Sequence, residues 1–155
     1  VRTSAFFIVI GLLFGVGSFV YVAIETESSR SPLYVALPPN AEEWSVQPMV
    51  TEPRQLVYYK VPTTDVESVA EHYQQEARNT DNELCRRSPA IGNFPDYVPN
   101  TGTVPYLWTC IFQRANIPGV SQTTEITIQP GVPNADPFLD TEGYTVIQYD
   151  QRWQR

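Results

Sequence analysis

The sequence is poor in the residues that bind metals, haem and nucleic acid. It has one histidine, one methionine, one lysine and two cysteines among 155 residues. So few ligands leave little material for axial haem ligation, and the absence of a C-x-x-C-H motif excludes haem of the c type. The single lysine, Lys60, argues against binding to nucleic acid or electrostatic docking on anionic lipid. We therefore expect no cofactor, no metal site and no nucleic-acid partner.

The residue sets of common catalytic sites are also missing. The sequence shows no Ser/His/Asp set, no Cys/His pair and no phosphate-binding glycine loop. The one histidine, His72, is predicted to lie off the apolar face of a helix, where a solvated side chain is more common than a proton-transfer group. We therefore expect no catalytic residue and predict that the chain is not an enzyme.

What the sequence does have is acidic charge and proline, both concentrated after residue 31. The net charge is −7, and all 14 prolines lie in this part. Solubility is the simplest reason for the acidity, with docking of a basic partner as the alternative. The proline content predicts long extended or irregular stretches.

The longest uncharged run covers residues 5–24, between Arg2 and Glu25. Twenty helical residues span about 30 Å, the thickness of a bilayer core, and the flanking charges favour a cytoplasmic N-terminus. A cleavable signal, the alternative, has a shorter apolar stretch of ~7–15 residues and an A-x-A-like site. We predict a single-pass inner-membrane protein with an external, periplasmic domain. Its parts are a transmembrane anchor (1–25), a connector (26–31) and the external domain (32–155).

Small residues recur along one side of the predicted span. Two of them form G-x-x-x-G, the close-approach motif of membrane helices. We therefore predict that this side packs against another helix. The packing residues are Ser4, Gly11, Gly15 and Ser18.

The clearest helix signal lies at residues 65–82. Thr64 and Glu67 match a capping box, with Thr64 as the N-cap. Apolar residues then recur at helical spacing and predict one buried stripe. The stripe consists of Val66, Val69, Ala70, Tyr73 and Ala77.

Runs rich in β-branched and aromatic residues predict five strands. Because modest loops join most of them, antiparallel pairing is favoured. The expected fold class is α+β, with one N-terminal transmembrane helix and an external domain in which one helix packs on a mostly antiparallel sheet. The predicted strands cover residues 33–37, 55–61, 107–114, 123–129 and 144–153.

Cys85 and Cys110 both lie in the predicted external domain. An even number of cysteines in an oxidising compartment favours a disulfide, and two buried free thiols are the alternative. A bridge requires the two Cα atoms to lie within ~7 Å. It would join the end of the helix to the strand at 107–114.

Two irregular loops are candidates for binding. Residues 86–106 form the candidate partner-contact loop, although packing on their own domain is the alternative. Its apolar members are Ile91, Phe94, Tyr97 and Val98. The loop at 131–143 carries oxygen ligands of the kind that calcium uses, but their spacing favours turn-forming roles. These residues are Asn134, Asp136, Asp140 and Glu142.

Thr64 or Asp65 leads to Val69 and Tyr73 in the pattern S/T-x-x-x-V-x-x-x-Y, and three predicted strands follow over 107–153. With this helix pattern and the three strands after it, the chain resembles small bacterial membrane-anchored modules. With its predicted anchor it resembles the small single-span accessory subunit of alternative complex III, a quinol-oxidising assembly of multihaem, iron–sulfur and large membrane-spanning subunits. A reaction-centre or other respiratory accessory subunit is the nearest rival.

The resemblance implies a cofactor-free stabilising piece. The expected function is that of a non-catalytic accessory subunit of a bacterial membrane electron-transfer complex. Its expected partners are larger integral membrane subunits, their external subunits and the lipid bilayer. The alternative is a membrane-anchored external ligand-binding module.

Overall fold

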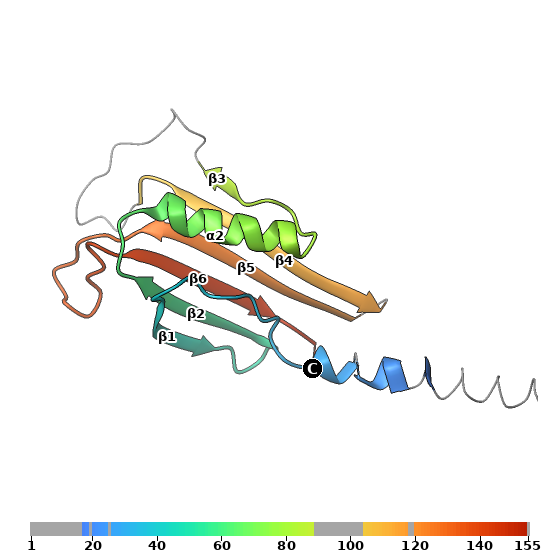
Figure 1. Ribbon diagram of the computed structural model, residues 1–155. Coiled ribbons are helices and arrows are strands. Elements are labelled where there is room, and N and C mark those ends of the chain that lie inside the picture. The colour runs from blue at the N-terminus through green and yellow to red at the C-terminus, as the bar shows by residue number, and fades with distance from the viewer. Residues whose placement is uncertain (1–16, 19, 25, 89–103, 118–119, 155) are drawn as a thin grey trace, which may run out of the picture.

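The computed structural model describes residues 17–18, 20–24, 26–88, 104–117 and 120–154. Helix α2 (Val66–Asn79) packs on a six-stranded antiparallel sheet of order β1-β2-β6-β5-β4-β3 (Figure 1). The strands are β1 (Glu42–Pro48), β2 (Arg54–Val61), β3 (Arg86–Ser88), β4 (Leu107–Ile117), β5 (Val120–Pro130) and β6 (Thr145–Arg152).

The described residues that precede the sheet are helical at 17–18, 20–24 and 26–28. No helix in the described part of the chain is long and apolar enough to cross a membrane. The predicted fold class, with its N-terminal transmembrane helix, is therefore wrong. The corrected class is one six-stranded antiparallel sheet with a short helix; residues 5–16 and 19 of the predicted span lie outside the described residues.

Alternate residues of the central strands point to one face of the sheet and form the core. Ile126 and Ile128 on β5 and Ile147 on β6 are fully buried. Phe112 on β4 is buried beside them, as the alternation of the sequence predicts. The core therefore lies between this face and helix α2.

Helix α2 begins one residue later than predicted and ends earlier. Asp65 is the N-cap, because its Oδ1 accepts the N–H of Ser68 at 3.1 Å. All five residues of the predicted stripe are buried. The helix ends at Asn79 with Thr80 as the C-cap: Asp81 then takes a positive φ of 56°, and the N–H of Asn82 bonds Ala77 O at 2.9 Å.

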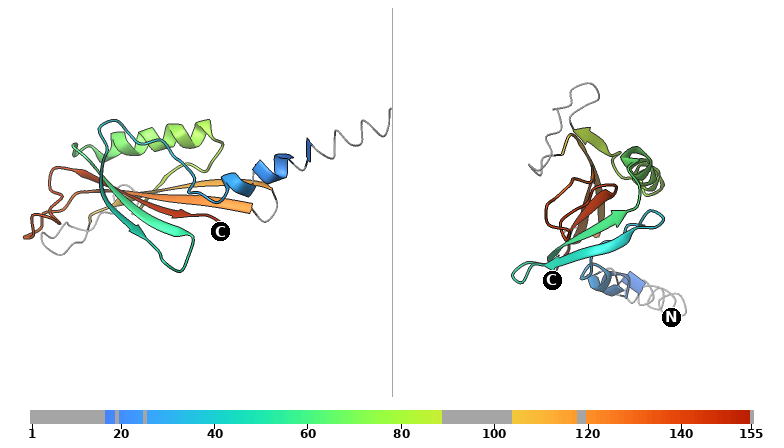
Figure 2. Two further views of the ribbon diagram at one scale, coloured as in Figure 1. Left: turned by 90° about the horizontal axis from the view of Figure 1, so that it is seen from below. Right: turned by 90° about the vertical axis from the view of Figure 1, so that its left-hand side faces the viewer.

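The predicted strand at 33–37 is not a strand, and the prediction missed β1 and β3. Residues 32–37, the crossing segment, pair with no strand in the described part of the chain, and the successive carbonyls of Val35 and Ala36 are bonded to β6 and to α2, as in an extended chain. The crossing segment and α2 lie on the same side of the sheet (Figure 2). Together they cover one face of the sheet.

The predicted disulfide between Cys85 and Cys110 is confirmed. The two Cα atoms lie 4.2 Å apart, and both residues are buried. Cys85 directly precedes β3, so the bridge ties the connection after α2 to the middle of β4.

Candidate functional site

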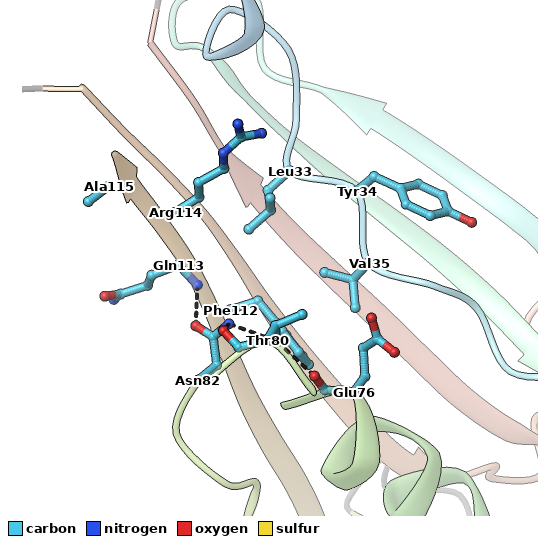
Figure 3. A pocket seen from close by; sticks show the side chains of 10 residues that line it. All are labelled: Leu33, Tyr34, Val35, Glu76, Thr80, Asn82, Phe112, Gln113, Arg114 and Ala115. Atoms are coloured by element: carbon cyan, nitrogen blue, oxygen red, sulfur yellow. Dashed lines mark hydrogen bonds between the residues drawn. The ribbon is translucent and has the colours of Figure 1, made fainter. Parts of the chain in front are cut away.

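A groove opens between the second half of α2, the crossing segment and the end of β4 (Figure 3). Its volume is about 410 Å³, within the range of roughly 300–1,000 Å³ found for ligand sites. Phe112, Val35 and Leu33 make an apolar floor, and polar and charged side chains surround it. The groove therefore combines apolar contact area with a few polar groups that can orient an occupant.

The crossing segment is held on the sheet by side chains rather than by a strand partner. Leu33 O accepts from Thr124 Oγ1 at 3.0 Å and from Gln151 Nε2 at 3.2 Å. Val35 O accepts from the hydroxyl of Tyr149 at 3.4 Å. These buried polar side chains satisfy carbonyls that would otherwise lack partners in the core. They fix the wall of the groove that faces α2.

His72 does not line the groove, but one turn before Glu76 it holds the crossing segment against α2 at that end. Its Nε2 lies 3.1 Å from Ala36 O, and because a carbonyl only accepts, this nitrogen donates. The side chain is half-buried. The prediction of a solvated His72 is therefore wrong, because the crossing segment covers this flank of the helix.

Asn82 borders the other end of the groove. Its Oδ1 accepts the N–H of Gln113 at 2.8 Å, beyond the part of β4 that β3 covers. The side chain thus caps a backbone donor on the edge of β4 and fixes the chain after α2. Thr80 lies between this contact and the floor.

The charges and the rim give the groove its binding chemistry. Glu76 is half-buried on α2, and its carboxylate makes no hydrogen bond or ion pair with any described residue. Arg114 lies at the opposite end (Figure 3). The ring of Tyr34 stands at the rim and is 82% exposed. The groove is therefore open, aromatic at its rim and oppositely charged at its ends.

Two buried tyrosines lie behind the floor. The hydroxyls of Tyr73 and Tyr149 are 2.8 Å apart, and Tyr149 donates to Val35 O. Burial raises the pKa of both hydroxyls far above the ordinary value, and for Tyr149 the adjacent Tyr73 adds to the rise. Both stay protonated at neutral pH. Through Tyr149 the pair is bonded to the carbonyl of Val35 in the crossing segment.

On the opposite face of the sheet, Asp150 binds two arginines. Arg54 is bidentate, with Nε to Oδ1 and Nη2 to Oδ2 both at 2.7 Å, and Arg152 Nη2 lies 2.6 Å from Oδ2. Burial of Asp150 favours the neutral acid, but the arginine hydrogen bonds outweigh it and lower the pKa of this carboxyl. Glu125 lies 4.0 Å from Arg152, so the cluster is balanced in charge and joins β2 to β6.

We expect Asp150→Asn to lower the free energy of unfolding by about 1–3 kcal/mol at pH 7, because two charge-assisted partners lose their acceptor. The unfolded pKa is about 3.9 and the folded pKa is lower, so this stability is present above pH 3.9 and is lost as pH falls through the folded pKa. Urea unfolding from pH 7 to 2 measures both effects. A difference from wild type that stays constant over this range, or an equal loss in the exposed control Glu42→Gln, would contradict the assignment.

A second, shallower hollow lies on the same opposite face. It has a volume of about 240 Å³ and lies between Trp44, Tyr58 and the loop residue Phe138, which is 83% exposed. Lys60 Nζ lies 4.2 Å from the ring centroid of Trp44, so a cation of the chain itself already occupies this aromatic face. We therefore rank the groove above this hollow.

The predicted loop at 131–143 uses its polar side chains in its own turns. Asp136 Oδ1 accepts the N–H of Phe138 at 2.9 Å, and Asp140 Oδ1 accepts that of Glu142 at 3.1 Å. Asn134 Oδ1 accepts the N–H of Asp136 at 2.9 Å. The interpretation as turn-forming residues is thus supported by their contacts.

Most other predicted contact residues lie outside the described residues. This applies to Ser4, Gly11 and Gly15 of the helix-packing set and to Ile91, Phe94, Tyr97 and Val98 of the partner-contact loop. Ser18 is described, helical and exposed. The groove is formed by other residues, chiefly Tyr34, Glu76 and Arg114.

Comparisons of the chain with protein-family models, with curated proteins and with solved structures found no match.

Proposed function

We propose that the chain is a non-catalytic accessory subunit that acts outside the cytoplasm and holds a segment of a larger partner protein in the groove. The observation that carries the proposal is the rim of the groove. Tyr34, which is 82% exposed, lines the groove together with an apolar floor and with Glu76, whose carboxylate has no hydrogen-bond or ion-pair partner among the described residues. Exposed aromatic residues beside a desolvated pocket are typical anchors of protein interfaces.

Two further features support the proposal. The disulfide is typical of proteins in oxidising compartments, which favours an external location. The buried tyrosines have a raised rather than a lowered pKa, which suits a rigid support better than acid–base chemistry. The kind of assembly, a membrane electron-transfer complex, follows from the sequence resemblance alone and stays a prediction.

A small-molecule site is the second candidate, and the volume of the groove favours it. About 410 Å³ suffices for a small ligand, and Glu76, Thr80 and Asn82 could orient one. Native mass spectrometry of the purified chain separates the two candidates. A small ligand would add a discrete mass to the free chain, whereas the proposed function requires a protein partner.

We expect Tyr34→Ala to release the partner. Truncation of an anchoring tyrosine costs about 2 kcal/mol, which is roughly a 30-fold loss of affinity. The full chain is expressed with an affinity tag in its native cells, extracted in mild detergent and examined by gel filtration and quantitative mass spectrometry. The wild type should elute with larger proteins, and their yield should fall at least fivefold for the variant.

The matched control is Phe138→Ala, which removes a ring of nearly equal exposure from the far side of the sheet. Its partner yield should equal that of the wild type. Elution of the wild type as a free monomer, or an equal loss in both variants, would refute the proposed function.

A further inference from the structure

The crossing segment leaves one backbone position in the groove without partners. Ala36 O points at α2, where His72 Nε2 lies 3.1 Å away. Backbone groups two residues apart in an extended chain point to the same side, so the N–H and C=O of Tyr34 also face α2. Neither group makes a hydrogen bond within the described residues. On the side that faces α2, Tyr34 therefore presents one main-chain donor and one acceptor that have no partner among the described residues.

Helix α2 offers this position no donor. One turn after His72 the helix carries Glu76, whose ionised carboxylate only accepts hydrogen bonds. The carboxylate points toward the crossing segment in Figure 3 and makes no hydrogen bond or ion pair with the described residues. Two acceptors, the C=O of Tyr34 and the carboxylate of Glu76, thus face the groove without a donor between them.

A planar cation with several donors satisfies both acceptors. A guanidinium carries five N–H donors in a fixed fork, is always charged and forms charge-assisted bonds to carboxylates. The exposed ring of Tyr34 supplies an aromatic surface on which such a group can stack. A lysine ammonium is a compact point charge and matches this arrangement less well.

We propose that the groove takes an arginine side chain from an extended segment of the partner protein. The inference rests on the proposed function, because it names the part of the partner that is bound. The guanidinium pairs with Glu76 and donates to the C=O of Tyr34, while a backbone carbonyl of the segment accepts the N–H of Tyr34, as in strand addition.

Charge supports this occupant. The net charge of −7 favours the approach of a basic segment.

The test uses a defined probe, the peptide Val-Thr-Arg-Thr-Val. It carries fluorescein on its N-terminus and an amide at its C-terminus. Fluorescence anisotropy measures its binding to the full chain at about 0.15 M salt, where long-range charge effects are screened. We expect saturable binding. Replacing the arginine by citrulline, which keeps the shape but removes the charge, should weaken binding about tenfold or more.

Variants of the chain locate the effect. Glu76→Gln should weaken binding of the arginine peptide by the same factor and abolish the preference for arginine over citrulline. Glu42→Gln removes the same charge from β1 and should change nothing.

Three results would overturn the inference: no saturable binding up to about 1 mM, equal binding of the arginine and citrulline peptides, or equal weakening by Glu42→Gln and Glu76→Gln. These outcomes are distinct from failure of the proposed function. If Tyr34→Ala releases the partner while the peptides show no preference for arginine, the partner is held by another chemistry. If Tyr34→Ala leaves the partner bound, the proposed function itself fails.

Discussion

Replacing both Cys85 and Cys110 by alanine is expected to lower the free energy of unfolding by about 3.5 kcal/mol. The bridge closes a loop of 25 residues, and in the chain-entropy model its loss returns this amount of freedom to the unfolded state. For a domain with a stability of about 5–15 kcal/mol, the change is a large fraction of the total. Urea unfolding of wild type and double variant, followed by tryptophan fluorescence and circular dichroism, measures it.

The disulfide is one of a few contacts that hold the connection after α2 on the sheet, together with the short strand β3 and the bond between Asn82 and Gln113. β3 contributes three residues to the sheet, and Cys85 lies directly before it. Gln74 adds two hydrogen bonds to the backbone of Cys85, each at 3.2 Å. Wild type unfolded in excess dithiothreitol should show the same loss as the double variant. A difference below about 1 kcal/mol between oxidised and reduced protein would show that the bridge adds little to stability.

The helix and the central strands were predictable because periodicity alone identifies them. The stripe of Val66, Val69 and Tyr73 has the helical period, and the alternation at Ile126 and Ile128 has the strand period. The missed strand β1 has neither pattern. Its exposed, acidic residues and the irregular pairing between Glu43 and Ser45 give no clear alternation. β3 is too short to produce a pattern.

The errors at residues 33–37 and 5–24 both come from judging a segment by its composition. Residues 33–37 have the composition of a strand, but their carbonyls are bonded by side chains such as Thr124 and Gln151, which no propensity anticipates. The uncharged run at 5–24 has the composition of a membrane span, but no helix in the described part of the chain is long and apolar enough to cross a membrane. Composition identifies apolar segments but not what covers them.

The groove could not be predicted, yet the sequence held one signal for it. Thr124 and Gln151 occupy core-facing positions of their strands and are buried. Polar residues in register with an apolar face require partners, so they indicate that a backbone segment crosses this part of the sheet. Tyr34 and Glu76 carry no such signal, because their meeting depends on how the crossing segment lies beside α2.

The buried tyrosine pair should make the protein sensitive to alkali. Tyr73 is fully buried and Tyr149 is 3% exposed, and burial raises the pKa of both hydroxyls above the ordinary value of about 10. Above pH 10 the unfolded chain therefore loses two protons that the folded chain keeps. These two residues should then lower the free energy of unfolding by up to about 2.7 kcal/mol for each pH unit above 10. Below pH 10 they should have no effect on its pH dependence.

We expect the double variant Tyr73→Phe with Tyr149→Phe to lose most of this dependence, as urea unfolding between pH 7 and 12 would show. At pH 7 it should lose only about 0.5–1.5 kcal/mol, since both hydroxyls of the 2.8 Å contact leave together and only Val35 O loses a donor. Tyr149→Phe alone should cost more, about 1–3 kcal/mol, because Tyr73 then keeps a buried hydroxyl without its acceptor.

Tyr34→Phe, which changes an exposed phenol, is the control and should follow the wild-type curve. If the double variant loses stability above pH 10 as steeply as the wild type, the tyrosine pair does not set the alkaline limit of the fold.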